Sequence, residues 1–242
     1  LSDGVTRTCV FLEDPMTAVK VQLIYDAYRD EDVIICHSEI TNGGKKDIIL
    51  RNFYSSSLPV KAGRYLLTHF HGSWAREMQM TSEVLTNGIK TIETRKGVRT
   101  THTENPSFIL SLDTDSWNEN YGEVIAGALA WSGNYRLSFQ IDETDRLNIL
   151  SGINPHASAY TLGKGETFVT PEMIYTYTDE EHIIMPVWFI HSFKHLVASK
   201  SVFMLQNVLG DGLNFRCALK RCSTHLDESG SFARIILNNI TV

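Results

Sequence analysis

Apolar and polar side chains alternate with a period of two through most of residues 18–177, and this alternation restricts the fold more than any other feature. The first clear stretch sets apolar Val19, Val21, Leu23 and Tyr25 between polar Lys20, Gln22 and Asp26. A period of two sends successive side chains to opposite faces of a strand, one of them buried. Because turn residues recur between short stretches of this kind, the sequence predicts an all-β sandwich or barrel.

Turn signals divide the alternating region into nine or so short strands. We expect strands over residues 18–26, 33–40, 65–71, 88–94, 108–112, 124–131, 135–141, 147–151 and 167–177, with a further apolar run from Ile48. Asn42-Gly43-Gly44 and Arg95-Lys96-Gly97 are expected turns, since these residue types tolerate the positive φ of tight turns. Residues 124–151 predict a three-stranded antiparallel meander. The sequence shows neither an alternation of strands and helices nor a glycine-rich phosphate loop. A parallel nucleotide-binding sheet is therefore disfavoured.

The pattern changes after Asp179. Phe189, Phe193, Leu196 and Val197 follow a helical spacing, whereas the segment beyond Gly210 shows no clear period. We therefore expect a β domain over residues 1–179, followed by a linker helix and tail over residues 180–242.

Charge and hydropathy exclude two classes of partner. The formal net charge is -6, from 22 basic and 28 acidic residues, and no basic run is interleaved with aromatic residues. Such a surface is unsuited to nucleic acid, whose phosphates need neutralising. No run approaches the roughly 20 apolar residues that span a bilayer, so no membrane partner is expected.

The four cysteines indicate a reducing compartment. Cys36 falls in an apolar run, where a buried, inert thiol is the usual interpretation. Cys217 and Cys222 have only His225 nearby, which is a weak signal for zinc. Residues 1–8 lack the pattern of an export signal. We expect a cytoplasmic protein without a cofactor.

Two groups of side chains could carry chemistry or binding. His69 and His71 lie two apart on an expected strand, so both face one side, and His37 or His102 could complete a cupin-like metal site. Structural, hydrogen-bonded histidines are the commoner alternative. The second group comprises Trp74, Trp117 and Trp131, because aromatic faces stack on sugar rings while nearby polar groups bind hydroxyls. Burial of these tryptophans in the sandwich is the alternative.

Known catalytic patterns do not stand out in this sequence. Glycoside hydrolysis requires two carboxylates facing one bond, and the spacing of the acidic residues singles out no such pair. No G-x-S-x-G nucleophile elbow occurs either.

A more specific signal comes from seven blocks in a fixed order. They are Leu67–Glu77 (LTHFHGSWARE), Ile92–Gly97 (IETRKG), Asn105-Pro106, Gly122-Glu123-Val124, Trp131–Arg136 (WSGNYR), Gly152–Pro155 (GINP) and Phe168–Glu172 (FVTPE). Together with Tyr25, Asp32-Val33-Ile34 and Ile40-Thr41-Asn42, they resemble the N-terminal β-domain of bacterial α-galactosidases of glycoside hydrolase family 36. The resemblance covers roughly residues 19–179.

This resemblance implies a β-supersandwich of the galactose mutarotase type that precedes a catalytic (β/α)8 barrel. In the family, the barrel hydrolyses terminal α-galactosides such as raffinose, stachyose and melibiose with retention. The family's nucleophile lies in a Lys-Trp-Asp motif and its acid/base in a Cys- and Gly-rich segment, and this chain has neither. No catalytic residue is therefore expected here. The implied role is to support the barrel, the homo-oligomer and the rim of the sugar pocket.

By the same resemblance, Trp74 and Arg76 are the first candidates for a sugar-facing or interdomain surface, and Trp131 and Asn134 follow. Ser73 stands where a basic residue is common in the family, and His71 where a small one is usual. A metal role for His71 would therefore be particular to this chain.

Two alternatives to the α-galactosidase interpretation stay open. One is a stand-alone carbohydrate-binding or oligomerising module, and the other is the cupin-like metal site. The chain's 242 residues are also too few for both a sandwich and a barrel, since a barrel alone takes about 250. A partial sandwich would leave unpaired strand edges and exposed apolar faces, so we expect self-association or poor solubility. The origin of residues 180–242, as a frameshift, a fusion or an unrelated ending, is likewise open.

Overall fold

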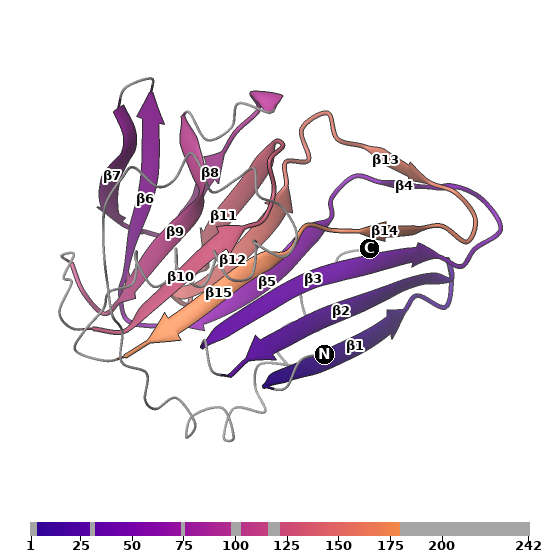
Figure 1. The fold of residues 1–242 in the computed structure, drawn as a ribbon, viewed down its shortest axis with the longest axis horizontal. Helices are drawn as coiled ribbons and strands as arrows, with labels where there is room; N and C mark the ends of the chain where they lie inside the picture. The colour runs from indigo at the N-terminus through magenta and orange to yellow at the C-terminus, as the bar shows by residue number, and fades with distance from the viewer. Residues whose placement is uncertain (1–3, 30–31, 74–75, 98–102, 116–121, 180–242) are drawn as a thin grey trace.

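The computed structural model describes residues 4–29, 32–73, 76–97, 103–115 and 122–179. Within these ranges the chain forms fifteen β-strands and no α-helix, and two antiparallel sheets make up most of the structure (Figure 1). This confirms the all-β antiparallel fold expected from the period-two alternation. No helix in the described part is long and apolar enough to cross a bilayer. The expected helix and tail over residues 180–242 lie outside the described residues.

The larger sheet has nine strands in the order β1-β2-β3-β15-β10-β9-β6-β7, with β14 also paired to β3. Their bounds are β1 Val5–Glu13, β2 Val19–Tyr28, β3 Val33–Asn42, β6 Tyr65–Ser73, β7 Arg76–Val84, β9 Glu104–Leu112, β10 Val124–Leu129, β14 Thr167–Val169 and β15 Met173–Thr178. The chain returns to this sheet several times, so strands distant in sequence become neighbours. Figure 1 shows β1 at one edge and β6 with β7 at the other.

The smaller sheet has four strands in the order β5-β12-β11-β8. Their bounds are β5 Tyr54–Lys61, β8 Gly88–Glu93, β11 Tyr135–Ile141 and β12 Arg146–Ile153. A separate pair is formed by β4 (Ile48–Leu50) and β13 (Tyr160–Leu162).

The main core lies between the two sheets. Phe108 of β9 meets Phe139 of β11 edge to face, with ring centroids 4.9 Å apart. Both rings belong to a buried apolar cluster that also includes Leu67, Leu137 and Ile149. Alternate residues of each strand supply this cluster, which is the physical origin of the period seen in the sequence. Cys36 is buried in the same cluster, as predicted, and burial raises the pKa of its thiol to about 12.

The expected three-stranded meander over residues 124–151 is wrong in its first half. The β11–β12 hairpin forms, with Phe139 opposite Ile149, but β10 pairs with β9 and β15 in the other sheet. Residues 130–134 therefore carry the chain from one sheet to the other and do not form a hairpin turn. Alternation shows which face of a strand is buried, but it does not show which strand lies beside it.

The two expected glycine turns differ in their cause. Gly97 adopts a positive φ of 66°, as predicted. Gly43 does not have a positive φ, but a Cβ at this position would lie 2.5 Å from the carbonyl oxygen of Ala18. Close approach of two backbones, rather than a hairpin turn, explains that glycine.

Candidate functional site

Several connections between strands gather at one end of the sandwich. The tip of the β6–β7 hairpin pairs Ser73 with Arg76, and His71 near that tip lies opposite Glu104, where β9 begins. The last residues of β10 lie beside the start of β9, because Ala128 pairs with Ser107. We call this region the loop end, and define it by residues 73, 76, 94–97, 130–134 and 154–159.

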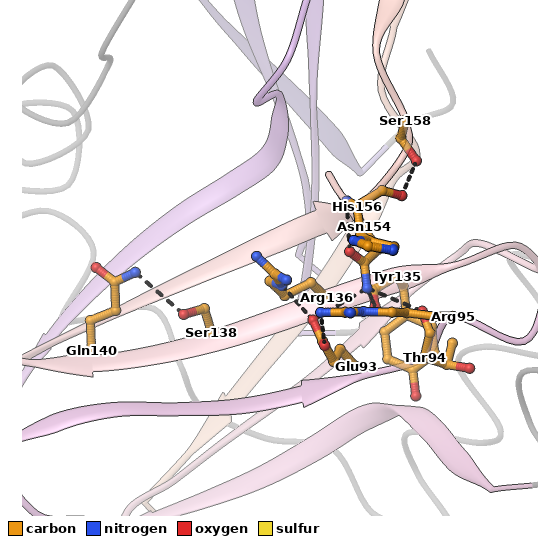
Figure 2. A network of polar contacts seen from close by, with 10 residues as sticks. All are labelled: Glu93, Thr94, Arg95, Tyr135, Arg136, Ser138, Gln140, Asn154, His156 and Ser158. Atoms are coloured by element: carbon orange, nitrogen blue, oxygen red, sulfur yellow. Dashed lines mark hydrogen bonds and ion pairs between the residues drawn. The ribbon is translucent and has the colours of Figure 1, made fainter.

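A buried asparagine organises the loop end. Asn154 follows β12, is fully buried, and its amide nitrogen donates to the carbonyl oxygens of Thr94 at 3.1 Å and Tyr135 at 3.4 Å. The same nitrogen lies 3.3 Å from the carboxylate of Glu93, and the backbone N–H of His156 donates to the amide oxygen at 3.0 Å. Figure 2 shows these groups converging from three segments of the chain. One side chain thus ties β8, β11 and the segment after β12 together.

Glu93 is the charged centre of this network. Its carboxylate accepts a 2.6 Å hydrogen bond from Nε of Arg136 on the neighbouring strand and lies 2.8 Å from the guanidinium of Arg95 (Figure 2). Burial acts to raise the pKa of Glu93, but the hydrogen bonds and positive charges of Arg136 and Arg95 outweigh it, so the pKa is lowered. Glu93 is therefore held as a carboxylate that fixes two arginines.

Asn134 holds two loops together. Its side-chain oxygen accepts a 2.7 Å hydrogen bond from the backbone N–H of Gly97, and its carbonyl oxygen accepts from the N–H of Asn154 at 3.0 Å. Gly97 has a positive φ, a conformation that glycine accepts without steric cost. The side-chain oxygen of Asn134 is thus already hydrogen-bonded within the protein.

Trp131 is partly buried and packs against the main core. Its indole covers Gly133, where an added Cβ would lie 2.6 Å from Nε1. Among the described residues, this Nε1 has no hydrogen-bond partner although it is buried. An indole N–H normally finds a partner when buried, so Trp131 combines a packing role with an unused donor at the loop end.

Of the other two predicted residues, the structure describes Arg76, which lies at the tip of the β6–β7 hairpin. Arg76 is exposed and begins β7. Trp74 lies outside the described residues, as does Trp117. The structure therefore brings Arg76, Trp131 and Asn134 to the same end of the sandwich.

His69 is placed between carboxylates from both neighbouring strands. Its Nε2 lies 3.4 Å from Glu83 of β7, and its Nδ1 lies 3.7 Å from Glu104 of β9. Glu83 also pairs with Lys90 of the smaller sheet at 2.5 Å, so this series of polar contacts joins the two sheets. The pKa of the nearby Tyr135 phenol is raised by burial and further by the charge of Glu104.

The proposed metal ligands are not brought together in the described residues. The rings of His69 and His71 have centroids 6.3 Å apart. His37 lies on β3, which β15, β10 and β9 separate from β6, or about 19 Å at the usual strand spacing. No group of three histidine, cysteine or acidic side chains that could hold a metal is found in the described part of the chain. His102, Cys217, Cys222 and His225 lie outside it.

Sequence reasoning missed Glu93, Arg136 and Asn154 as organisers of the loop end. All three fall within the blocks that resemble family 36, and that was the only signal available. Their partnership depends on register, since Arg136 lies directly opposite Glu93 and Asn154 reaches residues about 20 and 60 positions earlier.

Comparison with known proteins gives a consistent result. Residues 1–163 match the glycosyl hydrolase family 36 N-terminal domain. The chain is 29% identical over 171 residues to α-galactosidase AgaA of Geobacillus stearothermophilus and 30% identical over 178 residues to α-galactosidase Mel36A of Lactobacillus acidophilus. These alignments cover 71% and 74% of this chain but 23% and 24% of the relatives.

Solved structures agree with the sequence matches. A crystal structure of AgaA superposes with a TM-score of 0.70 at 28% identity, covering 74% of this chain and 24% of AgaA. The α-galactosidase of Lactobacillus brevis superposes with a TM-score of 0.72 at 27% identity, covering 81% of this chain and 26% of that protein. The chain spans about a quarter of the length of the relatives it matches. It belongs to the glycosyl hydrolase family 36 N-terminal domain family.

Proposed function

We propose that this chain forms the non-catalytic N-terminal sandwich of an α-galactosidase that acts on terminal α-galactosides such as raffinose and melibiose. The observation that carries the proposal is the match to the family 36 N-terminal domain and to about a quarter of the length of α-galactosidases. AgaA variants have been crystallised with stachyose and with raffinose. In this proposal the chain supports a (β/α)8 barrel, takes part in a homo-oligomer and contributes to the rim of the sugar pocket.

The loop end is the surface that we propose for the rim. Arg76 is exposed there, and a guanidinium can donate two hydrogen bonds to adjacent hydroxyls. Trp131 supplies an indole that packs beneath this surface, and the amide nitrogen of Asn134 makes no hydrogen bond among the described residues, whereas its oxygen binds Gly97. Trp74, two residues before Arg76, completes the proposed set.

The non-catalytic role is tested with the purified chain and a chromogenic α-galactoside. We expect no hydrolysis above the buffer blank at any protein concentration. Turnover that scales with the chain and survives repeated purification would refute the proposal.

The rim is tested in a chimera in which this chain replaces the matching segment of AgaA, about a quarter of that protein. We expect Arg76→Ala to raise KM for raffinose while kcat is largely kept, because a rim contact holds substrate outside the reacting bond. Arg146→Ala is the matched control, since Arg146 is also exposed but begins β12 at the opposite end of the sandwich. Equal effects of the two substitutions would exclude a rim role for Arg76.

A stand-alone carbohydrate-binding module is the second candidate, favoured by the exposed Arg76 at the loop end. Calorimetric titration of the chain with galactose and raffinose separates the two functions. A heat signal that Trp131→Ala or Trp74→Ala abolishes supports a binding module, whereas a silent titration supports the structural role.

A cytoplasmic location is part of the proposal. Cys9 and Cys36 are free thiols, and a reducing compartment keeps thiols in that state. Cell fractionation with an antibody to the chain tests this, and recovery from the medium or the envelope would contradict it.

A further inference from the structure

A closed ring of hydrogen bonds holds the connection that follows β8. The side chain of Asn154 donates to the carbonyl oxygen of Thr94 at 3.1 Å, and the backbone N–H of Gly97 donates to the side chain of Asn134 at 2.7 Å. The carbonyl oxygen of Asn134 accepts from the N–H of Asn154 at 3.0 Å, which completes the ring. Residues 94–97 are thus fixed at both ends, so this loop presents its side chains from a rigid backbone.

Arg95 extends from this loop, and Glu93 fixes the direction of its guanidinium. One guanidinium nitrogen lies 2.8 Å from the Glu93 carboxylate, while 49% of the Arg95 side chain stays exposed. The other carboxylate oxygen of Glu93 accepts from Arg136 at 2.6 Å, so each oxygen holds one arginine (Figure 2). A guanidinium carries five N–H donors in a rigid fork. One contact with a carboxylate therefore orients the group without using all of its donors.

The second arginine adds little to the stability of this cluster. Arg136 lies directly opposite Glu93 across the β8–β11 pair and is enough to neutralise one carboxylate, so Arg95 leaves a positive charge at the loop end. An ion pair as exposed as that of Arg95 contributes little to stability. The arrangement is instead that of a preorganised donor, because a side chain that is already immobilised loses less entropy when it binds.

We propose that Arg95 is a further substrate-binding residue of the rim and that Glu93 is its positioning residue. This rests on the proposed function and extends its set of rim residues. The loop that carries Arg95 is bonded to Asn134 of that set through Gly97. In this role the Arg95 guanidinium donates to hydroxyls of the sugar units that lie beyond the galactose of raffinose, because a rim contacts substrate outside the reacting bond.

Kinetics of the AgaA chimera with two substrates test this contact. Raffinose carries sugar units beyond its galactose, whereas a chromogenic aryl α-galactoside lacks them. We expect Arg95→Ala to raise KM for raffinose about tenfold, the effect of losing one hydrogen bond to a charged group. The kcat for raffinose and the KM for the aryl substrate should be largely kept. Arg95→Lys should restore only part of the loss, because an ammonium lacks the planar fork of a guanidinium.

Arg64→Ala is the matched control. The Arg64 side chain is 53% exposed and pairs with Asp115, but it precedes β6 at the end of that strand opposite Ser73, so neither KM should change. Equal rises of both KM values in Arg95→Ala, or an effect no larger than that of Arg64→Ala, would overturn the proposal. If Arg76→Ala raises KM for raffinose and Arg95→Ala does not, Arg95 alone is excluded. If neither does, the rim of the proposed function fails as well.

Glu93→Gln tests the positioning role. Glutamine keeps the size of the side chain but removes the charge that holds Arg95. We expect KM for raffinose to rise in Glu93→Gln, and the further change Arg95→Ala to add little, because the two residues act through one contact. In the purified chain, NMR should show slow hydrogen exchange of the Arg95 guanidinium, which Glu93→Gln makes fast. Additive effects on KM, or exchange that Glu93→Gln leaves unchanged, would exclude Glu93 as the positioning residue.

Discussion

Only glycine fits at residue 133, because the indole of Trp131 occupies the space where a side chain would lie. A Cβ at residue 133 would lie 2.6 Å from Nε1 and 2.9 Å from Cε2 of that ring, which is closer than real atoms approach. Gly133→Ala must therefore move the indole or the loop, at a cost of about 1–3 kcal/mol. Urea unfolding followed by circular dichroism measures this cost. Ser132→Ala, in the same loop but exposed, is the control, and equal loss of stability in both variants would contradict the explanation.

Glu93 makes stability depend on pH in a defined direction. Its pKa in the folded chain is lowered from the ordinary value of 4.5, so its contribution is complete above that value and is lost as pH falls through the folded pKa. We expect Glu93→Gln to destabilise the chain at pH 7, with a difference from wild type that shrinks as the pH falls below about 4.5. Urea unfolding at a series of pH values checks this. A difference that is constant or grows on acidification would show that the arginines do not act on Glu93.

At the scale of elements, the contact between β9 and β10 depends on Gly127. It lies opposite Phe108, and a Cβ there would come within 2.5 Å of the Phe108 ring and 2.7 Å of Met173. Gly127→Ala should therefore destabilise the chain by about 1–3 kcal/mol, although alanine itself suits a strand better than glycine. In a Phe108→Leu background the same change should cost less, because the obstructing ring is gone. Additive losses in the double variant would exclude the steric cause.

The strands that sequence patterning missed have a common position. β1, β5 and β7 are edge strands, and β13 belongs to a separate two-stranded pair. Most described residues of β1 and β7 are exposed, so no buried face imposes a period of two on their sequences. β5 also contains Pro59, which a sheet tolerates at an edge but which weakens a strand prediction. The expected strand over residues 167–177 is two strands, β14 and β15, interrupted at residues 170–172.

At the scale of the whole molecule, the described structure ends just after β15, which pairs with β3 and β10 near the middle of the larger sheet. A shortened chain of residues 1–179 keeps every strand described here. We expect it to show an all-β circular dichroism spectrum and one cooperative urea transition. Spectral loss of β structure in the shortened chain would mean that residues 180–242 are needed for folding, and that the expected boundary at residue 179 is wrong.

The candidate site was predicted in outline by resemblance and in detail only by structure. The blocks around Arg76, Trp131 and Asn134 are short loop sequences, and register brings them to one end of the sandwich. The contact that each residue makes depends on distances between segments far apart in sequence, and a local sequence pattern does not show these distances. Asn134 binds a backbone N–H 37 residues earlier, and the Trp131 indole occupies the space over Gly133.

The sequence by itself determined that this chain is an antiparallel β protein with Cys36 in its core, because burial on one face of a strand imposes a period of two along the chain. The ordered blocks also determined the family. Only the tertiary structure decided which strands are neighbours, that β10 and β11 belong to different sheets, and that Asn154 and Glu93 join the loops. Those choices depend on contacts between residues far apart in sequence, and each becomes visible only when the register of the strands is known.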